Sequence, residues 1–100
     1  MEKVYENALI IELKKIGLHV LAQHPIRVYY DSAIVGEYFA DLLVENTIII
    51  EIKAAKTIGI EHEAQLLNYL KATQLEVGLI LNFGPHAEFS RRAFDNSRKK

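Results

Sequence analysis

The sequence contains no cysteine, only two prolines and no long apolar run. The lack of cysteine excludes disulfide bonds and thiolate chemistry. No run approaches the roughly 18 apolar residues that can cross a bilayer, and the N-terminus lacks the charged and apolar regions of a signal peptide. We therefore expect a soluble cytoplasmic protein with no membrane partner.

The chain also lacks an excess of charge of either sign, because 12 lysines and arginines oppose 13 acidic residues. A net charge of −1 produces no strong global field, so any phosphate-binding surface must be a local patch. Half of the residues are apolar, and a chain of 100 residues makes one domain. We expect that domain over residues 1–95 and a frayed basic tail over residues 96–100. The basic residues of the ending SRRAFDNSRKK could contact phosphate or could be merely solvated.

Apolar residues at helical spacing predict two helices. The first covers residues 2–16, and Gly17 follows as a C-terminal stop. Its apolar stripe consists of Tyr5, Leu9, Leu13 and Ile16. The second helix covers residues 60–72, IEHEAQLLNYLKA. Its expected core stripe consists of Ile60, Ala64, Leu67 and Leu70.

Runs rich in β-branched residues predict the strands between and after these helices. The expected strands cover residues 18–30, 37–44, 47–54 and 76–84, with a turn over 31–36 and an optional last element over 87–94. Pro25 suits an edge or bent strand, whereas the almost continuous apolar run of 47–54 suits a central strand. The fold class is therefore α/β with the element order αβββαβ.

Three charged residues interrupt the apolar stretch ADLLVENTIIIEIKA at residues 40–54. They are Asp41, Glu51 and Lys53, and an ionised group in a buried strand is unfavourable unless something compensates its lost hydration. Glu51 and Lys53 share one face of their strand because side chains alternate. A two-residue hairpin loop would pair Asp41 with Ile50 on the other face, whereas a three-residue loop would pair it with Glu51. Both loop lengths are common.

Asp41 opposite Glu51 would create a site for a divalent metal ion. Directly opposed like charges destabilise a sheet, and two buried carboxylates cannot both stay ionised without a cation. Oxygen ligands select hard ions such as Mg²⁺ or Mn²⁺, which commonly act on phosphate esters. Lys53 could then stabilise a phosphoryl transition state or help hold the attacking water. The competing interpretation is an edge strand whose Glu51 and Lys53 face water and pair loosely.

These residues resemble the signature of a known superfamily. Asp41 followed by Glu51, Ile52 and Lys53 is similar to the PD-(D/E)xK motif of restriction-endonuclease-like nucleases. The resemblance implies an αβββαβ core with a central mixed sheet flanked by two helices. It also implies that Asp41, Glu51 and the Ile52 carbonyl bind Mg²⁺ or Mn²⁺ while Lys53 assists hydrolysis.

A smaller branch, the GxxExxY family, resembles the chain more closely from residue 2 to about residue 84. The similar stretches are EKVYENAL, GEYFADLLVENTIIIEIKA and HEAQLLNYLKATQLEVGLILNFG. Glu2 and Tyr5 match the E and Y of that family's motif, whereas its glycine would precede Met1. The resemblance therefore implies that the upstream helix usual in the family is missing here.

Two further sets of polar residues are candidates for the site. Gln65 and Tyr69 lie opposite the expected core stripe and have the QxxxY spacing of RecB-like members, in which this pair is thought to contact nucleic acid. The alternative for them is a surface glutamine and a tyrosine that snorkels. Glu2 falls in line with the apolar stripe of the first helix and is a candidate metal ligand, with Glu6 as the second choice. The helix dipole alone could instead explain an acid in the first turn.

We therefore expect a metal-dependent nuclease that forms a homo-oligomer and acts on DNA more readily than on RNA. The oligomer is expected because so small a chain leaves apolar surface exposed. A rival hypothesis is a catalytically inactive nuclease-fold module for binding or assembly. A third hypothesis, an α/β scaffold with a coincidental motif, predicts Asp41 and Glu51 on opposite faces.

Overall fold

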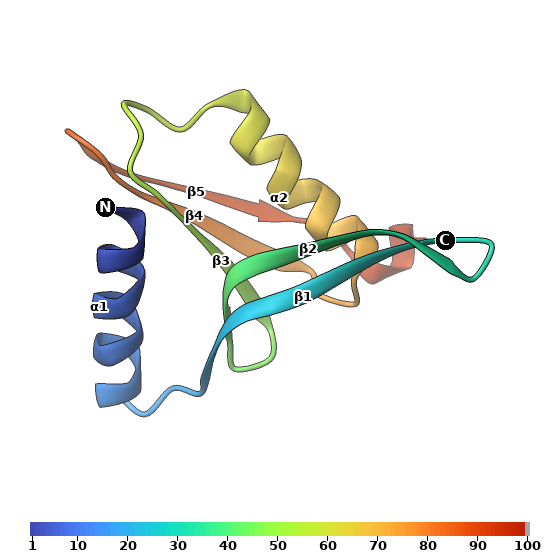
Figure 1. Ribbon diagram of the computed structural model, residues 1–100, viewed down its shortest axis with the longest axis horizontal. Coiled ribbons are helices and arrows are strands. Elements are labelled where there is room, and N and C mark those ends of the chain that lie inside the picture. The colour runs from blue at the N-terminus through green and yellow to red at the C-terminus, as the bar shows by residue number, and fades with distance from the viewer. Residues whose placement is uncertain (100) are drawn as a thin grey trace.

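The computed structural model describes residues 1–99 and consists of one mixed sheet with a helix on each face (Figure 1). In chain order the elements are α1 (Glu2–Lys15), β1 (Val20–Tyr30), β2 (Ala33–Val44), β3 (Ile48–Lys53), α2 (Ile60–Ala72), β4 (Val77–Phe83), β5 (Ala87–Ala93) and a short 3₁₀ helix, η1 (Asn96–Arg98). The strands are ordered β1-β2-β3-β4-β5, and only β3 and β4 run parallel. The predicted fold class is confirmed, and the optional last element is the strand β5.

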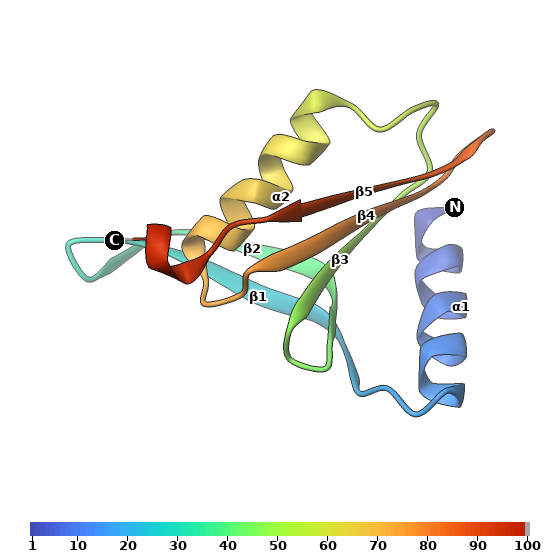
Figure 2. The same cartoon turned by 180° about the vertical axis from the view of Figure 1, so that it is seen from behind.

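Hydrophobic clusters fill both faces of the sheet, which Figure 2 shows from behind. The cluster under α2 contains Ile26, Ala40, Ile49, Leu66, Tyr69, Leu70 and Ile80. The cluster on the other face contains Val20, Leu42, Val44, Ile50 and Ile52, against which Tyr5, Leu9 and Leu13 of α1 pack. β3 contributes to both clusters because its successive isoleucines point to opposite faces. Its expected central position is confirmed.

Helix α1 ends where the sequence predicts, at a glycine with a left-handed backbone. Gly17 has a φ of 88°, and the amides of Gly17 and Leu18 donate to the carbonyls of Lys14 and Leu13. This is the Schellman arrangement, which satisfies the last carbonyls of a helix. The stripe prediction was wrong at its last member, because Ile16 lies in this cap and is 73% exposed.

The hairpin of β1 and β2 is longer than predicted. The expected turn over 31–36 shrinks to Asp31 and Ser32, which both have positive φ, and Tyr30 already pairs with Ala33. A two-residue turn of this kind matches the twist of the strands, so the following residues continue β2. β1 is an edge strand, as expected from Pro25.

The C-terminal tail, which the sequence predicts to be frayed, forms hydrogen bonds with the rest of the chain through Lys99. The Lys99 ammonium donates to the carbonyls of Thr73 and Leu75 and to Asn96 Oδ1, at 2.8, 2.7 and 2.6 Å. These bonds fasten η1 beside the end of α2, a contact that the basic composition of the tail does not reveal. Lys100 lies outside the described residues.

Within residues 1–99, none of the helices is both long and apolar enough to cross a membrane.

Candidate active site

A three-residue loop joins β2 to β3 and sets the register of the site. Leu42 pairs with Ile50 and Val44 with Ile48, so Asp41 stands opposite Glu51. The loop contains a turn in which the Thr47 amide donates to the Val44 carbonyl at 3.0 Å. The two central residues of this turn, at positions 45 and 46, both have positive φ. The hypothesis of a coincidental motif, which required opposite faces, is therefore wrong.

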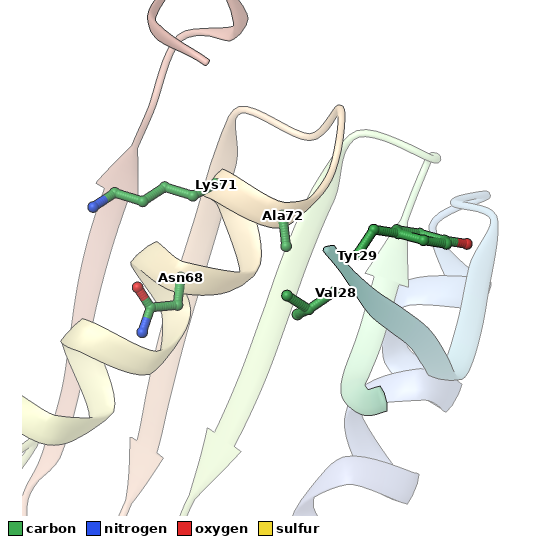
Figure 3. A pocket seen from close by; sticks show the side chains of 5 residues that line it. All are labelled: Val28, Tyr29, Asn68, Lys71 and Ala72. Carbon is green, nitrogen blue, oxygen red and sulfur yellow. The ribbon is translucent and has the colours of Figure 1, made fainter. Parts of the chain in front are cut away.

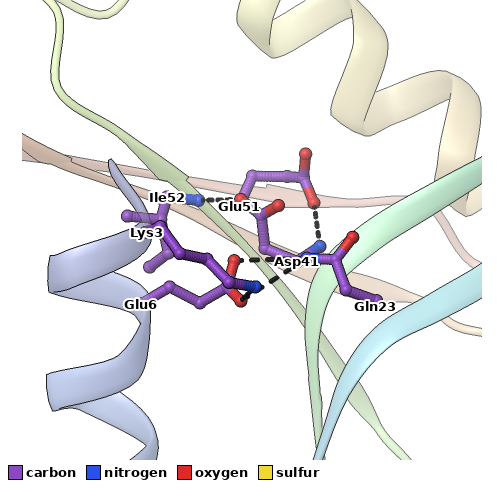
Figure 4. A network of polar contacts seen from close by, with 6 residues as sticks. All are labelled: Lys3, Glu6, Gln23, Asp41, Glu51 and Ile52. Carbon is purple, nitrogen blue, oxygen red and sulfur yellow. Dashed lines mark hydrogen bonds and ion pairs between the residues drawn. The ribbon is translucent and has the colours of Figure 1, made fainter. Parts of the chain in front are cut away.

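The two carboxylates replace the ladder bonds at the point where β2 and β3 separate (Figure 4). Glu51 Oε2 accepts the backbone N–H of Asp41 at 2.8 Å. In return, Asp41 Oδ2 accepts the backbone N–H of Ile52 at 2.7 Å. Each acid therefore holds the backbone of the other strand, and the two carboxyl groups are fixed on adjacent strands.

Burial and mutual repulsion make this pair hard to ionise. Glu51 is 5% exposed, and burial together with the charge of Asp41 raises its pKa to about 7. Burial also raises the pKa of Asp41, against the opposing effect of the hydrogen bond from Ile52. Lys53 lowers the pKa of both acids, which places its charge near them, although it forms no ion pair within the described residues.

The donor set fits a hard divalent cation. One oxygen of each acid accepts a backbone N–H, while Asp41 Oδ1 and Glu51 Oε1 accept no hydrogen bond from residues 1–99. A cation bound by these two oxygens would favour the ionised form of both acids, against the burial that raises their pKa values. The described residues contain no group of three or more His, Asp or Glu side chains placed to hold a metal, so the remaining ligands would be waters and backbone oxygen. Mg²⁺ tolerates such a set because it usually keeps several waters.

Helix α1 brings Glu6, rather than Glu2, into the interior beside this pair. Glu6 is 4% exposed, forms an ion pair with Lys3 at 2.7 Å and accepts a hydrogen bond from the Gln23 amide (Figure 4). Its charge raises the pKa of both Asp41 and Glu51. Among the α1 acids, Glu6 therefore has the stronger electrostatic link to the site.

Glu2 is exposed and lies at the edge of the site. Its Oε2 accepts the backbone N–H of Ala54 at 3.3 Å, and its charge contributes to the raised pKa of Asp41. Glu2 lies on the same side of α1 as Tyr5 and Glu6, but it is the first residue of the helix and its side chain is exposed. Glu2 thus contacts the segment that follows Lys53.

Helix α2 places Tyr69 beside the acids, and it buries a different face from the one predicted. Its buried residues are Leu66, Tyr69 and Leu70, while Ile60 in the first turn is 83% exposed. Burial and the charges of Glu51 and Asp41 raise the pKa of Tyr69 to about 12, so the phenol stays neutral near them. The ring of Tyr38 lies 6.0 Å from the Tyr69 ring. The expectation that Tyr69 points away from the core was therefore wrong.

Gln65, one turn before Tyr69, is exposed. His62, near it in the sequence, caps the helix, because its Nδ1 accepts the Gly59 amide at 3.0 Å.

Two polar residues that the sequence interpretation missed hold the connection after Lys53. Asn82 is 1% exposed, and its carboxamide accepts from the Ala55 amide and donates to the Ala55 carbonyl. Glu88 accepts from Asn82 and from the Ile58 amide. An asparagine in the apolar run VGLILNF was the available signal, since buried amides normally hold backbone groups.

Comparison with known proteins assigns the chain to a family. The family model of the PD-(D/E)XK nuclease superfamily matches residues 1–93. The chain belongs to the PD-(D/E)XK nuclease superfamily. Membership implies a nuclease-type fold, and nucleases of this superfamily generally use divalent metals.

A solved structure supports the fold of this superfamily member. The structure titled "Crystal structure of SSO0001" superposes with a TM-score of 0.70 at 19% sequence identity. The match covers 93% of this chain but 50% of the other, so the chain spans half the length of that protein. No curated protein matches the sequence.

Proposed function

We propose that this chain is a metal-dependent nuclease that hydrolyses phosphodiester bonds, in DNA more readily than in RNA. The observation that supports this most strongly is the pair of crossed carboxylates at the separation of β2 and β3. Two acids with raised pKa values, one free oxygen each and a neighbouring lysine form an arrangement suited to a cation and a phosphate.

In this proposal Asp41, Glu51 and the Ile52 carbonyl hold Mg²⁺ or Mn²⁺, and Glu6 or Glu2 supports the site from α1. When bound, the metal would lower the pKa of a coordinated water and neutralise charge on the phosphate. Lys53 would stabilise the negative charge that develops on the phosphoryl group or orient the attacking water.

We further propose that Gln65 and Tyr69 contact the substrate strand, as in the QxxxY arrangement of RecB-like members. Tyr69 lies near both acids and is neutral, so its hydroxyl can donate to a phosphate oxygen without competing for the metal. Gln65 is exposed on the preceding turn. The finer assignment to the GxxExxY branch rests on the motif residues Glu2 and Tyr5.

A cleavage assay tests the catalytic proposal. We expect the parent to cut a labelled DNA oligonucleotide with Mg²⁺ or Mn²⁺ and to be inactive in EDTA. Glu51→Gln and Lys53→Ala should each reduce cleavage by at least about 100-fold, the lower end of the range for such groups. Glu12→Gln on the exposed side of α1 is the matched control and should cut like the parent. Equal cleavage by Glu51→Gln and the parent would contradict the proposal.

One observation favours a non-catalytic binding or assembly module as the second candidate. The described residues offer two close carboxylates rather than a group of three or more possible metal ligands. Such a module would bind nucleic acid or a partner chain without turnover. Oligonucleotide binding that persists in EDTA, combined with no cleavage in Mg²⁺ or Mn²⁺, would identify it.

A further inference from the structure

Two hollows on the surface meet at Lys71 on α2. The first is a cleft of about 380 Å³ between β1 and α2, lined by Val28, Tyr29, Asn68, Lys71 and Ala72 (Figure 3). The second, of about 170 Å³, is lined by Lys71, Phe94, Arg98 and Lys99. Among residues 1–99, neither lining includes an acidic residue, although the whole chain carries 13 acids and a net charge of −1. The surface around Lys71 is therefore a local basic patch on a nearly neutral protein.

Two cations of this patch converge on one aromatic ring. The Lys71 side chain extends away from Tyr29 (Figure 3), and its Nζ lies 5.4 Å from the centre of the Phe94 ring. Arg98 Cζ lies 4.5 Å from the same centre. Neither cation has an acidic partner within 4 Å in the described part of the chain. Two like charges held at one ring repel each other, so an anion between them would be stabilising.

The tail is fastened so that Arg98 stays in this position. Lys99 uses its ammonium protons on Thr73, Leu75 and Asn96, so it serves as a fastener rather than as an anion ligand. Glu76, an acid near the tail, is also occupied, because its Oε2 accepts the Asn96 amide at 2.7 Å. Because Lys99 is engaged in this way, Lys71 and Arg98 are the cations of the patch that can bind an anion from outside the chain.

We propose that Lys71 and Arg98 anchor a phosphate of a nucleic-acid strand, with the Asn68 amide contacting the same strand in the adjoining cleft. The proposal rests on the proposed nuclease function, because α2 links this patch to the acid pair. Asn68 and Lys71 flank Tyr69 on α2, and the phenol of Tyr69 lies within the electrostatic reach of Glu51 and Asp41. A strand that leaves the acid pair along α2 would therefore meet this anchor within a few nucleotides.

Binding in EDTA tests the anchor without relying on turnover. Fluorescence anisotropy of a labelled single-stranded DNA oligonucleotide should show salt-sensitive binding by the parent. The double variant Lys71→Gln and Arg98→Gln should bind at least tenfold more weakly, and its slope of log affinity against log salt should be shallower by about 1.4, which corresponds to two lost phosphate contacts. Asn68→Ala should weaken binding without changing that slope, because the amide carries no charge.

The control variant removes the same number of positive charges at the C-terminal end of α1. Lys14→Gln with Lys15→Gln alters net charge equally and should bind within twofold of the parent. All exchanged side chains are exposed, so melting temperatures should match. Competition with inorganic phosphate distinguishes a site for a nucleic-acid strand from a site for free phosphate. If the site binds the strand, millimolar phosphate should displace the labelled oligonucleotide only weakly. Equal binding by the Lys71 and Arg98 variant and the control, or no binding by the parent, would overturn the anchor.

The anchor and the proposed nuclease function can fail separately. If the double variant loses binding while the parent shows no cleavage with any metal, the anchor stands and the catalytic proposal fails. If the parent cleaves DNA and the double variant binds and cleaves equally well, the catalytic proposal stands and the anchor is wrong.

Discussion

Glu51 is the residue in which folding and the proposed chemistry conflict. Its side chain is almost fully buried, faces a second carboxylate and accepts a hydrogen bond from the backbone N–H of Asp41. The carboxyl group that joins the two strands is therefore one whose ionisation is unfavourable. Groups with such perturbed pKa values concentrate at functional sites. Given a three-residue loop, the parity of the hairpin residues predicts this conflict.

The raised pKa of Glu51 predicts a stability that falls as pH rises. The carboxyl titrates near 4.5 in the unfolded chain and at about 7 in the folded one, so the folded chain binds more protons between these values. The free energy of unfolding should therefore decrease on the order of 3 kcal/mol between about pH 4.5 and pH 7 in the absence of metal, and Asp41 acts in the same direction. Urea unfolding in EDTA at pH 5 and pH 8 measures this change.

Glu51→Gln supplies the matched comparison for that pH dependence. The amide oxygen still accepts the Asp41 N–H, so the variant should be at least as stable as the parent at pH 8 in EDTA and should depend less on pH. A purely structural ion pair predicts the reverse, a loss of roughly 3–5 kcal/mol on removing one partner. A large loss of stability in Glu51→Gln would therefore refute the catalytic assignment.

Residue-level patterns predict the acid pair but not the environment contributed by other elements. Strand alternation depends on neighbours in sequence, so Asp41 was expected opposite Glu51 with a three-residue loop and opposite Ile50 with a two-residue loop. The burial of Glu6 depends on where α1 meets the sheet, and its partner Gln23 lies on another element. That contact is tertiary, so the sequence pointed to Glu2 instead.

The element that matters most for the site is the connection between β3 and α2. The Asn82 carboxamide hydrogen-bonds both the amide and the carbonyl of Ala55, as a neighbouring peptide group would. Gly84 allows the chain to pass close to Ala55, because a Cβ at position 84 would lie 1.8 Å from the Ala55 carbonyl oxygen. Glu88 holds the next residues, through Thr57 and the Ile58 amide. The connection thereby fixes both Lys53 before it and α2 after it.

Loss of the Asn82 carboxamide should destabilise the protein. Asn82→Ala leaves the amide and carbonyl of Ala55 without partners, at about 1–3 kcal/mol for each buried group. Chemical denaturation should show a lower midpoint with an unchanged slope. Asn68→Ala, an exposed asparagine of α2, is the control and should change stability by less than about 0.5 kcal/mol. Equal stability of Asn82→Ala and the parent would mean that water satisfies Ala55.

Element boundaries followed from the sequence more closely than element orientation. Residues 60–72 form the predicted helix because Gly59 precedes it and its composition favours helix. The face that it buries was mispredicted, because Leu66 and Tyr69 are buried with Leu70, whereas Ile60 and Ala64 are exposed. Gly78 shows what decides the orientation, since a Cβ there would meet the side chain of Leu66 at 2.5 Å.

At the scale of the whole molecule, exposed apolar side chains lie on both helices, on the β1–β2 hairpin and on β5. They include Val4 and Ile11 on α1, Tyr29, Tyr30, Ile34, Val35 and Phe39 on the β1–β2 hairpin, and Phe89 on β5. Exposed apolar surface of this extent is common at interfaces. We predict a homodimer or larger oligomer at tens of micromolar, to be measured by light scattering. A monomer mass across that concentration range would contradict this prediction.

The overall architecture was predictable because its signals are local and repeated. Hydrophobic periodicity gave the order of helices and strands, and the motif of acids and lysine connected that order to a known superfamily. The hydrogen bonds of Lys99 were not predictable, because the carbonyls of Thr73 and Leu75 come close to it only in the fold.

The central claim is that Asp41 and Glu51 form a metal site, and calorimetric titration with Mn²⁺ at pH 7 tests it most directly. The parent should bind with millimolar affinity or better and should release protons, seen as a dependence of the heat on buffer ionisation, because Glu51 has a pKa of about 7 before binding. Glu51→Gln should show no binding, while Glu12→Gln should bind like the parent. Absence of binding by the parent at millimolar Mn²⁺, or equal binding by Glu51→Gln, would contradict the account.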